Sequence, residues 1–241
     1  MPLLEAKKIS KTYYSDGVET PVLHDITFSI EEGELLAITG PSGSGKSTLL
    51  HIVGFLDEPT GGKFCFNDKC MMDYTDEEIA KIRNKEMGFV FQAFNLLPRT
   101  SVYDNVKLPL LYSDIPEDEW EKNIWDAIKA VDLEHRAEHL SHQLSGGEKQ
   151  RVAIARSLVC KPKVIFADEP TGNLDTKTEM KIMDILRDLN EKEGHTIIII
   201  THDPTVASYV HRNIHIIDGR IHSDRKSKKN SSRAKLKKEK K

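Results

Sequence analysis

The residue types best suited to chemistry in this chain lie in a glycine-rich turn at residues 40–48. An apolar run precedes the turn and a helix-forming run follows it. The turn fits the pattern G-x-x-x-x-G-K-[ST], which binds phosphate in that context. Glycines permit a tight backbone path whose N–H groups point inward at the positive end of a helix. The lysine supplies a mobile charge for β- and γ-phosphates, which also makes it a catalytic candidate, and the serine after it can ligate Mg²⁺. The candidate phosphate-binding residues are Gly40, Pro41, Ser42, Gly43, Ser44, Gly45, Lys46, Ser47 and Thr48.

Two adjacent carboxylates, Asp168 and Glu169, follow a second apolar run at residues 164–167. At the end of a buried strand opposite a phosphate loop, Asp168 can reach the water shell of Mg²⁺, and Glu169 can orient and deprotonate an attacking water. In isolation such a pair more often caps a helix. The phosphate loop elsewhere in the chain favours the catalytic interpretation.

A second anion site is indicated at residues 145–147, where Ser145, Gly146 and Gly147 begin a helix-forming run that extends to residue 158. A hydroxyl and unobstructed N–H groups at a helix start suit a phosphate. The alternative is an ordinary serine N-cap without a ligand.

The elements that must position these residues predict an α/β fold. Residues 35–39, 164–168 and 196–201 are continuous apolar strands, which is typical of a parallel sheet covered on both faces. Shorter strands before and after the phosphate loop, at residues 3–9, 26–30 and 63–66, indicate a small antiparallel β region. The helical spacing of residues 102–108, 117–131 and 146–158, with prolines between them, predicts a helical subdomain inserted at about residues 93–160.

Composition limits the class of protein further. The chain has 241 residues, and none of its apolar runs approaches the roughly 20 residues needed to cross a bilayer, so we expect a cytosolic protein whose membrane role, if any, depends on a partner. Cys65, Cys70 and Cys160 have no C-x-x-C spacing and no histidines beside them. We therefore predict neither a zinc site nor a disulfide framework.

The charge is distributed unevenly along the chain. Residues 225–241 hold ten lysines or arginines and one glutamate, a charge of +9, so the overall charge of −3 leaves −12 on residues 1–224. A basic segment with so few apolar residues predicts a disordered tail after a folded domain at residues 1–224. The tail could simply be solvated, or it could bind anionic lipid or, less favoured, nucleic acid.

Six motifs in this order and spacing resemble the ATP-binding cassette ATPases of ABC transporters, and the resemblance covers about residues 3–222. The motifs are the phosphate loop, Gln92 after an apolar strand, LSGGE at residues 144–148, Asp168-Glu169, NLD at residues 173–175 and THD at residues 201–203. The implied fold is a P-loop NTPase with an inserted helical subdomain that carries the LSGGE signature. The implied activity is ATP hydrolysis with Mg²⁺.

The resemblance also implies roles for individual residues. Tyr13 corresponds to the aromatic that stacks on adenine, with the neighbouring Tyr14 a weaker match. Gln92 would contact Mg²⁺ or the attacking water and join Ser47 and Asp168 as a metal ligand, and His202 would contact the γ-phosphate. Two copies would close head to tail, so that each ATP lies between Lys46 of one chain and Ser145 and Gly147 of the other. Glu148 departs from the commoner glutamine, which leaves only the fine tuning of that interface open.

Several stretches resemble the lipoprotein-release and macrolide-export branch of the family, among them residues 22–25, 54–62, 88–98, 105–110 and 168–175. That branch implies an integral membrane permease as partner, a cytoplasmic cassette bound to the inner face of the membrane, and export or extraction of a lipoprotein, peptide or antibiotic. The permease would contact a groove around residues 94–100, although Leu96 and Leu97 could equally be core. A regulatory cell-division cassette without transport remains an alternative. A soluble DNA-repair or translation cassette is disfavoured, because this chain has one cassette and no sustained heptads.

Overall fold

A computed structural model describes residues 1–226 of the protein, and a six-stranded sheet lies at its centre. The strand order is β10-β9-β3-β8-β7-β6, and every pair is parallel except the antiparallel pair β9–β10. The strands are β3 (Leu35–Thr39), β6 (Met87–Phe91), β7 (Val164–Asp168), β8 (Thr196–Thr201), β9 (Arg212–Ile217) and β10 (Arg220–Lys226). The predicted parallel sheet is confirmed, and β9 and β10 extend it by two strands that the motifs did not indicate.

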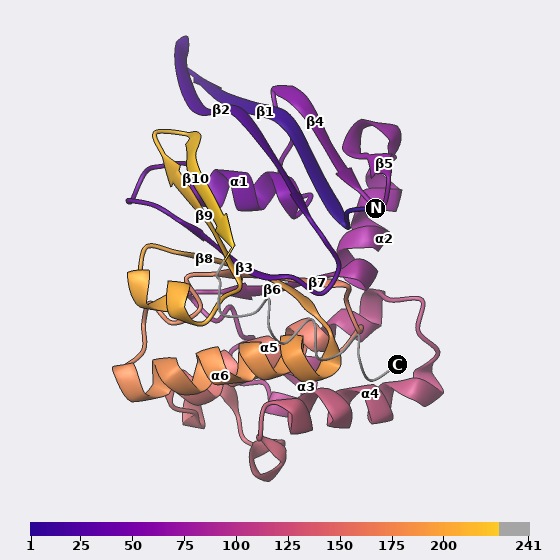
Figure 1. Cartoon of the computed structure of the whole chain (residues 1–241). Helices are drawn as coiled ribbons and strands as arrows, with labels where there is room; N and C mark the ends of the chain where they lie inside the picture. Colours follow the sequence, from indigo (N-terminus) through magenta and orange to yellow (C-terminus); the bar gives the residue numbers. More distant parts are fainter. Residues whose placement is uncertain (227–241) are drawn as a thin grey trace, which may run out of the picture.

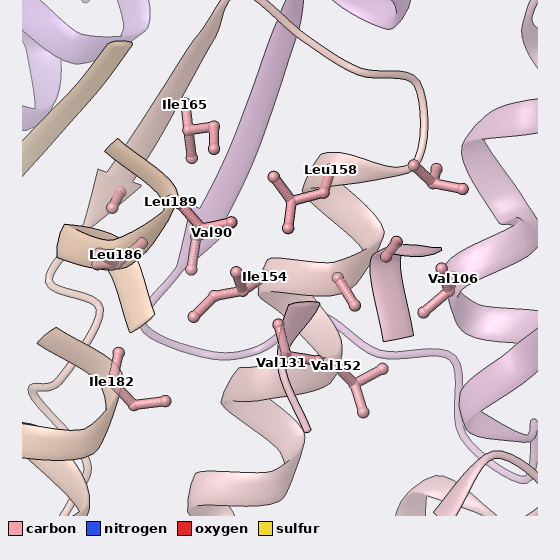
Figure 2. Packing of buried hydrophobic residues seen from close by; sticks show 14 of the residues in the cluster. Val90, Val106, Val131, Val152, Ile154, Leu158, Ile165, Ile182, Leu186 and Leu189 are labelled. Carbon is pink, nitrogen blue, oxygen red and sulfur yellow. The ribbon is translucent and has the colours of Figure 1, made fainter. Parts of the chain in front are cut away.

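In the middle of this sheet both faces are buried, which explains why β3, β7 and β8 are apolar at consecutive positions. The edge strand β10 is mostly exposed. One face packs against α3 (Val102–Lys107), α4 (Glu117–Ala130), α5 (Gly146–Leu158) and α6 (Thr176–Glu193). Figure 2 shows Val90 and Ile165 of the sheet beside Ile154 of α5 and Leu186 of α6. These side chains are fully buried, so this layer holds the helices rigidly to the strands.

The other face packs against α1 (Lys46–Val53) and a four-stranded antiparallel sheet, as Figure 1 shows. The order of that sheet is β2-β1-β4-β5. Its strands are β1 (Leu4–Ser15), β2 (Val18–Ile30), β4 (Gly61–Phe66) and β5 (Lys69–Cys70). The predicted small antiparallel region is confirmed, and β1 runs further than expected, through the two tyrosines.

The helical insertion lies between β6 and β7, as the sequence predicts. It contains α3, α4, α5 and the short 3₁₀ segments Leu108–Tyr112, Glu134–Arg136 and Ser141–Gln143. Helix α3 ends at Lys107, before Pro109, and the chain continues as a 3₁₀ turn. Proline lacks the N–H that a continuing α-helix would need there. Two further 3₁₀ segments lie at Met71–Asp73 and Pro204–Ser208, and α2 (Asp76–Glu86) begins at a capping box formed by Thr75 and Glu78.

The prediction for the cysteines is wrong in one respect. Cys65 and Cys70 form a disulfide. They face each other in the register of β4 and β5, which form a tight hairpin. Spacing along the chain did not indicate the bond because only the turn between the strands brings the two side chains together. Cys160 is free and buried, and burial raises the pKa of its thiol to about 11.

At the carboxyl-terminal end, β10 includes Arg225 and Lys226, the first two residues of the segment predicted as a basic tail. The rest of that segment, residues 227–241, lies outside the described residues. Within residues 1–226, no helix is long and apolar enough to cross a membrane.

Candidate nucleotide-binding site

Four neighbouring parallel strands bring the chemistry-bearing residues to one edge of the central sheet. In the register of the sheet, Thr39 is level with Thr201, and Asp168 is level with both Ile200 and Phe91. The residue directly after each strand is therefore delivered to the same edge. These residues are Gly40 after β3, His202 after β8, Glu169 after β7 and Gln92 after β6.

The phosphate loop joins β3 to α1 in a conformation that requires its glycines. Gly45 immediately precedes α1 with φ +93°, and a Cβ at Gly45 would lie 2.7 Å from the Leu23 side chain. A Cβ at Gly40 would lie 2.1 Å from the backbone oxygen of Ile216. Pro41, Ser42, Gly43 and Ser47 are exposed, whereas Ser44, Gly45 and Lys46 are buried and Thr48 is half-buried. The Ser44 hydroxyl has no hydrogen-bond partner within the described chain, which leaves it available to an anion.

Charges of both signs lie close together beneath the loop. The Lys46 ammonium donates to the Pro41 carbonyl at 2.8 Å. Burial lowers the pKa of Lys46, while Glu169 and Asp168 oppose that shift. Burial, and then the charge of Glu169, raise the pKa of Asp168, which His51 and Lys46 partly offset. A lysine of the loop and two carboxylates after β7 thus lie close together. This combination of charges suits a phosphate group that is bound together with a cation.

Glu169 and His202 are joined directly. The Glu169 Oε1 atom lies 2.7 Å from His202 Nδ1 and accepts a hydrogen bond from the His202 backbone N–H at 3.1 Å. Glu169 Oε2 accepts from the Thr201 hydroxyl at 3.1 Å. The backbone of Glu169 has φ +45°, a left-handed value that is unfavourable for a side-chain-bearing residue. The carboxylate is therefore held at the sheet edge by β8 and can accept a proton there.

Gln92 contacts the loop that follows Glu169. Its backbone carbonyl accepts from the Asn173 side chain at 3.1 Å, and its side-chain nitrogen lies 3.5 Å from Asn173 Oδ1. A Cβ at Gly172 would lie 2.8 Å from the same nitrogen. Gln92 is itself exposed. It is thus placed between the end of β6 and the chain that leads to α6.

Oxygen donors suitable for Mg²⁺ are present at the loop. Asp168 Oδ1 is buried and has no hydrogen-bond partner among the described residues, which is costly unless a ligand compensates. Ser47, in the first turn of α1, is exposed beside the loop. Residues 1–226 contain no group of three His, Cys, Asp or Glu side chains that could hold a metal by themselves. The donor set fits a magnesium ion held largely by phosphate oxygens and water, to which these two residues and Gln92 would add ligands.

Tyr13 lies on β1 and is tethered from one side. Its hydroxyl donates to Asp57 Oδ2 at 3.0 Å, and Asp57 Oδ1 accepts from Lys11 at 2.6 Å. Although burial alone would raise the pKa of Asp57, the hydrogen bonds from Lys11 and Tyr13 hold it below its ordinary value. Tyr13 is 40% exposed and Tyr14 69% exposed. Tyr13 is therefore an accessible ring held in place, which suits a stacking surface, whereas Tyr14 is more exposed.

The signature residues lie apart from the loop within one chain. Ser145 caps α5 and is exposed, and Gly147 is half-buried against Thr178 of α6, where a Cβ would lie 2.3 Å from a methyl group. Among residues 1–226, no hydrogen bond or ion pair joins Ser145 or Gly147 to residues 40–48. The Glu148 N–H is bonded to the Ser145 hydroxyl, whereas the N–H groups of Gly146 and Gly147 at the start of α5 have no partner within the helix, so they can receive an anion from outside the chain.

Sequence reasoning missed the polar residues of α5 that hold the loop after Gln92. The Arg156 guanidinium donates to the carbonyls of Asn95 at 2.5 Å and Phe94 at 2.9 Å, and both of those residues have positive φ. Gln150 is fully buried and donates to the Phe91 carbonyl at 3.4 Å. A charged residue directly after the apolar run at residues 152–155 was the available signal for Arg156.

Known proteins resemble this chain over nearly all of its length. A family model described as ABC transporter matches residues 23–172. The uncharacterized ABC transporter ATP-binding protein YvrO of Bacillus subtilis is 46% identical over 219 residues, which are 91% of this chain and 95% of that protein. The macrolide export ATP-binding/permease protein MacB of Bdellovibrio bacteriovorus is 46% identical over 223 residues, which are 92% of this chain. The chain spans only 34% of the length of MacB.

Solved structures of ABC transporter cassettes also superpose on this chain. The dimeric structure of MJ0796, a bacterial ABC transporter cassette, superposes with a TM-score of 0.84 at 43% identity and covers 92% of this chain and 98% of that one. A dimeric post-hydrolysis state of the same cassette, bound to ADP and Pi, gives a TM-score of 0.83 at 42% identity with the same coverage.

The fold and the glycine loop define a P-loop NTPase of the α/β class. The chain belongs to the ABC transporter family, as an ATP-binding cassette with the ATPase fold.

Proposed function

We propose that this protein hydrolyses ATP between two copies of itself and uses the closure of that dimer to drive an integral membrane permease. The observation that carries the proposal is the delivery of Gly40, Gln92, Glu169 and His202 to one sheet edge by four adjacent strands. A phosphate loop, a carboxylate base and a polar sensor at one edge are what phosphoryl transfer to water requires.

Each residue then has a distinct task. Lys46 and the backbone N–H groups of residues 42–48 bind the β- and γ-phosphates, and Tyr13 stacks on the base. Glu169 takes the proton of the attacking water, for which its position and its hydrogen bonds from β8 prepare it. His202 orients Glu169 and reaches the γ-phosphate. Ser47, Asp168 and Gln92 would hold Mg²⁺, which would supply positive charge to offset the charge that develops on the phosphates.

The partner copy completes the site. Within one chain Ser145 and Gly147 lie away from the phosphate loop, and both lie at the beginning of a helix that can receive an anion. Head-to-tail closure brings the signature of one copy to the nucleotide of the other. The dimeric structures of MJ0796 support the formation of a dimer.

The surface beside β6 is the proposed binding site of the permease. A cleft of about 350 Å³ lies there between the strand and the helical insertion, lined by residues that include Phe89, Leu108, Tyr112 and Arg156. Residues 94–100, where the sequence predicts the permease contact, do not line this cleft but adjoin it, because Arg156 in its wall donates to the carbonyls of Phe94 and Asn95. A partner segment that contacts both the cleft and this loop would sense nucleotide occupancy. MacB combines an ATP-binding part and a permease in one chain, which supports a permease as the partner. We therefore propose a cytoplasmic cassette at the membrane, which serves export or extraction of a lipoprotein, peptide or antibiotic.

The proposal divides the chain into one ATPase domain, which β10 extends from the predicted boundary at residue 224 to Lys226, with its helical subdomain at about residues 93–160, and a basic tail. The tail adds attraction to anionic lipid next to the permease. A role in binding nucleic acid is not proposed.

The variant Glu169→Gln tests the reaction. It keeps the size of the side chain and removes the proton acceptor, so ATP binding should persist while hydrolysis stops. We expect steady-state turnover to fall at least about 100-fold and Mg-ATP to convert the variant from monomer to dimer in sedimentation velocity. Glu121→Gln, an exposed glutamate of α4, is the matched control and should behave as the parent. A Glu169→Gln protein that remains monomeric with ATP, or that hydrolyses at the parental rate, would contradict the proposal.

A further inference from the structure

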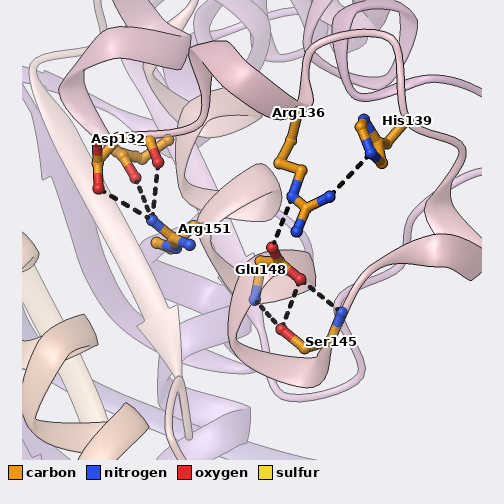
Figure 3. Close-up of polar contacts among 7 residues, drawn as sticks. Asp132, Arg136, His139, Ser145, Glu148 and Arg151 are labelled. Carbon is orange, nitrogen blue, oxygen red and sulfur yellow. Dashed lines mark hydrogen bonds and ion pairs between the residues drawn. The ribbon is translucent and has the colours of Figure 1, made fainter.

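The start of α5 holds a network that commits the hydroxyl proton of Ser145. Its Oγ donates to Glu148 Oε2 at 2.7 Å and accepts from the Glu148 backbone N–H at 3.3 Å, and its own N–H donates to Glu148 Oε2 at 2.8 Å (Figure 3). A hydroxyl has a single proton to donate. Ser145 must therefore turn away from Glu148 before it can donate to a phosphate.

Glu148 is a charged member of this network. Its side chain is 16% exposed. The hydrogen bonds from the hydroxyl and N–H of Ser145 hold its pKa below the ordinary value, with smaller contributions from the charges of Arg136 and Arg151. This carboxylate lies in the first turn of α5, which is where the proposed function puts the γ-phosphate bound to the partner copy. Two anions at one helix N-terminus repel each other.

Arg136 is the cation that faces this carboxylate. Its Nε donates to Glu148 Oε1 at 3.1 Å, whereas Ser145 binds the other carboxylate oxygen. A second contact, from the Arg136 guanidinium to His139 Nε2 at 2.8 Å, holds the guanidinium in place. Within residues 1–226, Glu148 forms no other ion pair.

Arg151 does not replace Arg136 as the partner of Glu148. Its guanidinium donates to the carbonyls of Val131 and Asp132 at 3.0 and 2.9 Å, and it lies 3.8 Å from the Asp132 carboxylate. Arg151 therefore fastens the end of α4 to α5, and its charge is shared with Asp132.

We propose that Arg136 is a positioning residue for ATP-driven dimerisation: by pairing with Glu148 it offsets the negative charge of the signature and keeps the carboxylate bound when Ser145 turns its hydroxyl toward the nucleotide of the partner copy. The inference rests on the proposed head-to-tail dimer. Loss of Arg136 should therefore weaken the dimer only while residue 148 carries a carboxylate.

A double-mutant cycle measures that dependence. The dimer dissociation constant with Mg-ATP is measured by sedimentation for the Glu169→Gln protein and for the same protein carrying Arg136→Ala, Glu148→Gln, or both changes. We expect Arg136→Ala to weaken the dimer about tenfold, and Glu148→Gln to stay within about twofold of its parent. The double variant should match Glu148→Gln alone. Arg136→Lys, which restores the charge, should recover most of the loss, and the loss caused by Arg136→Ala should shrink at high salt.

The outcomes separate the inference from the function on which it rests. Equal losses from Arg136→Ala with and without Glu148→Gln would assign Arg136 a purely structural role and overturn the inference, as would no loss in either background. If the Glu169→Gln parent does not dimerise with ATP, the proposed function fails and the inference fails with it. Thermal melts of all four proteins identify any general loss of folding.

Discussion

Three residues of the nucleotide-binding site have features that lower the stability of the folded chain, and binding of a magnesium nucleotide explains each of them. Asp168 has a buried, unpartnered oxygen, Glu169 has a left-handed backbone, and Lys46 is a buried ammonium. Each of these features destabilises a folded chain without ligand. Their concentration at one sheet edge is what a site that binds a magnesium nucleotide would produce.

We therefore predict that Asp168→Asn stabilises the nucleotide-free protein while impairing its activity. The substitution removes a buried charge whose desolvation is the largest cause of its raised pKa. We expect the melting temperature to rise by about 3 °C and Mg²⁺-dependent hydrolysis to fall by at least about tenfold. Differential scanning calorimetry without nucleotide measures the first effect. A variant less stable than the parent would show that Asp168 contributes to folding rather than opposing it.

The same residue sets a pH dependence. Because the pKa of Asp168 is higher in the folded than in the unfolded chain, its ionisation disfavours folding at neutral pH, and that penalty is relieved as the pH falls through the raised value. The difference in melting temperature between Asp168→Asn and the parent should thus shrink in acid and disappear below the ordinary pKa of 3.8. A difference that is constant with pH would assign the effect to packing.

At the scale of single elements, most boundaries have a local cause. Thr75, Ser101, Ser145 and Asp175 each accept a hydrogen bond from the first turn of the helix after it. Such caps are worth about 1 kcal/mol each, and they explain why the predicted starts of α3 and α5 agree with the structure. The hairpin of β4 and β5 is different, since a covalent bond closes it.

We predict that this disulfide stabilises the fold without affecting the reaction. The two cysteines are 5 residues apart, and a loop of that length corresponds to about 2 kcal/mol of lost chain entropy in the unfolded state. Reduction should lower the melting temperature by roughly 4–8 °C and leave ATP turnover unchanged. The double variant Cys65→Ser/Cys70→Ser should melt like the reduced parent and not respond to reductant. Because thiols in the cytosol are usually reduced, identical melts of oxidised and reduced parent would mean that the cysteines do not pair in solution.

At the scale of the whole molecule, the helical insertion connects the site with a surface that a partner can reach. Arg156 and Gln150 fasten the residues around Gln92 to α5, so the signature helix and the loop after β6 move together. Leu96 and Leu97, for which core and interface were both open, differ in the structure. Leu96 packs against the core beneath the insertion, whereas Leu97 is 43% exposed.

We predict that Leu97→Asp uncouples the cassette from its permease. The Leu97 backbone is held by Asn105 at 2.8 Å and Ser141 at 3.0 Å, so the loop should keep its course while the exposed side chain becomes charged. Turnover by the isolated protein should stay within about twofold of the parent. Binding to the permease recovered with Glu169→Gln from gently solubilised membranes should be lost.

The matched variant is Leu96→Asp, which puts a charge against the core and should lower stability by several kcal/mol. Normal permease binding by folded Leu97→Asp would move the coupling surface elsewhere on the molecule. Loss of both turnover and binding would instead assign Leu97 to folding.

The class of fold, the phosphate loop and the identity of the residues directly after β6, β7 and β8 could all be predicted from the sequence. Apolar runs ending at Gly40, Gln92, Glu169 and His202 are local patterns, and parallel strands must deliver their next residues to one edge. The start of α5 at Gly146 was likewise local, because its capping residues are close together in the chain.

The contacts between distant side chains could not be predicted from the sequence, because they depend on how the elements pack. The pair Glu169–His202, the tether of Tyr13 to Asp57 and the contact of Arg136 with Glu148 join residues on different elements. The Cys65–Cys70 bond required a hairpin that spacing alone did not reveal. The physical reason is common to all four: hydrophobic periodicity specifies which face of an element is buried, but packing sets how elements are rotated and aligned, and a polar contact depends on that alignment to within about an ångström.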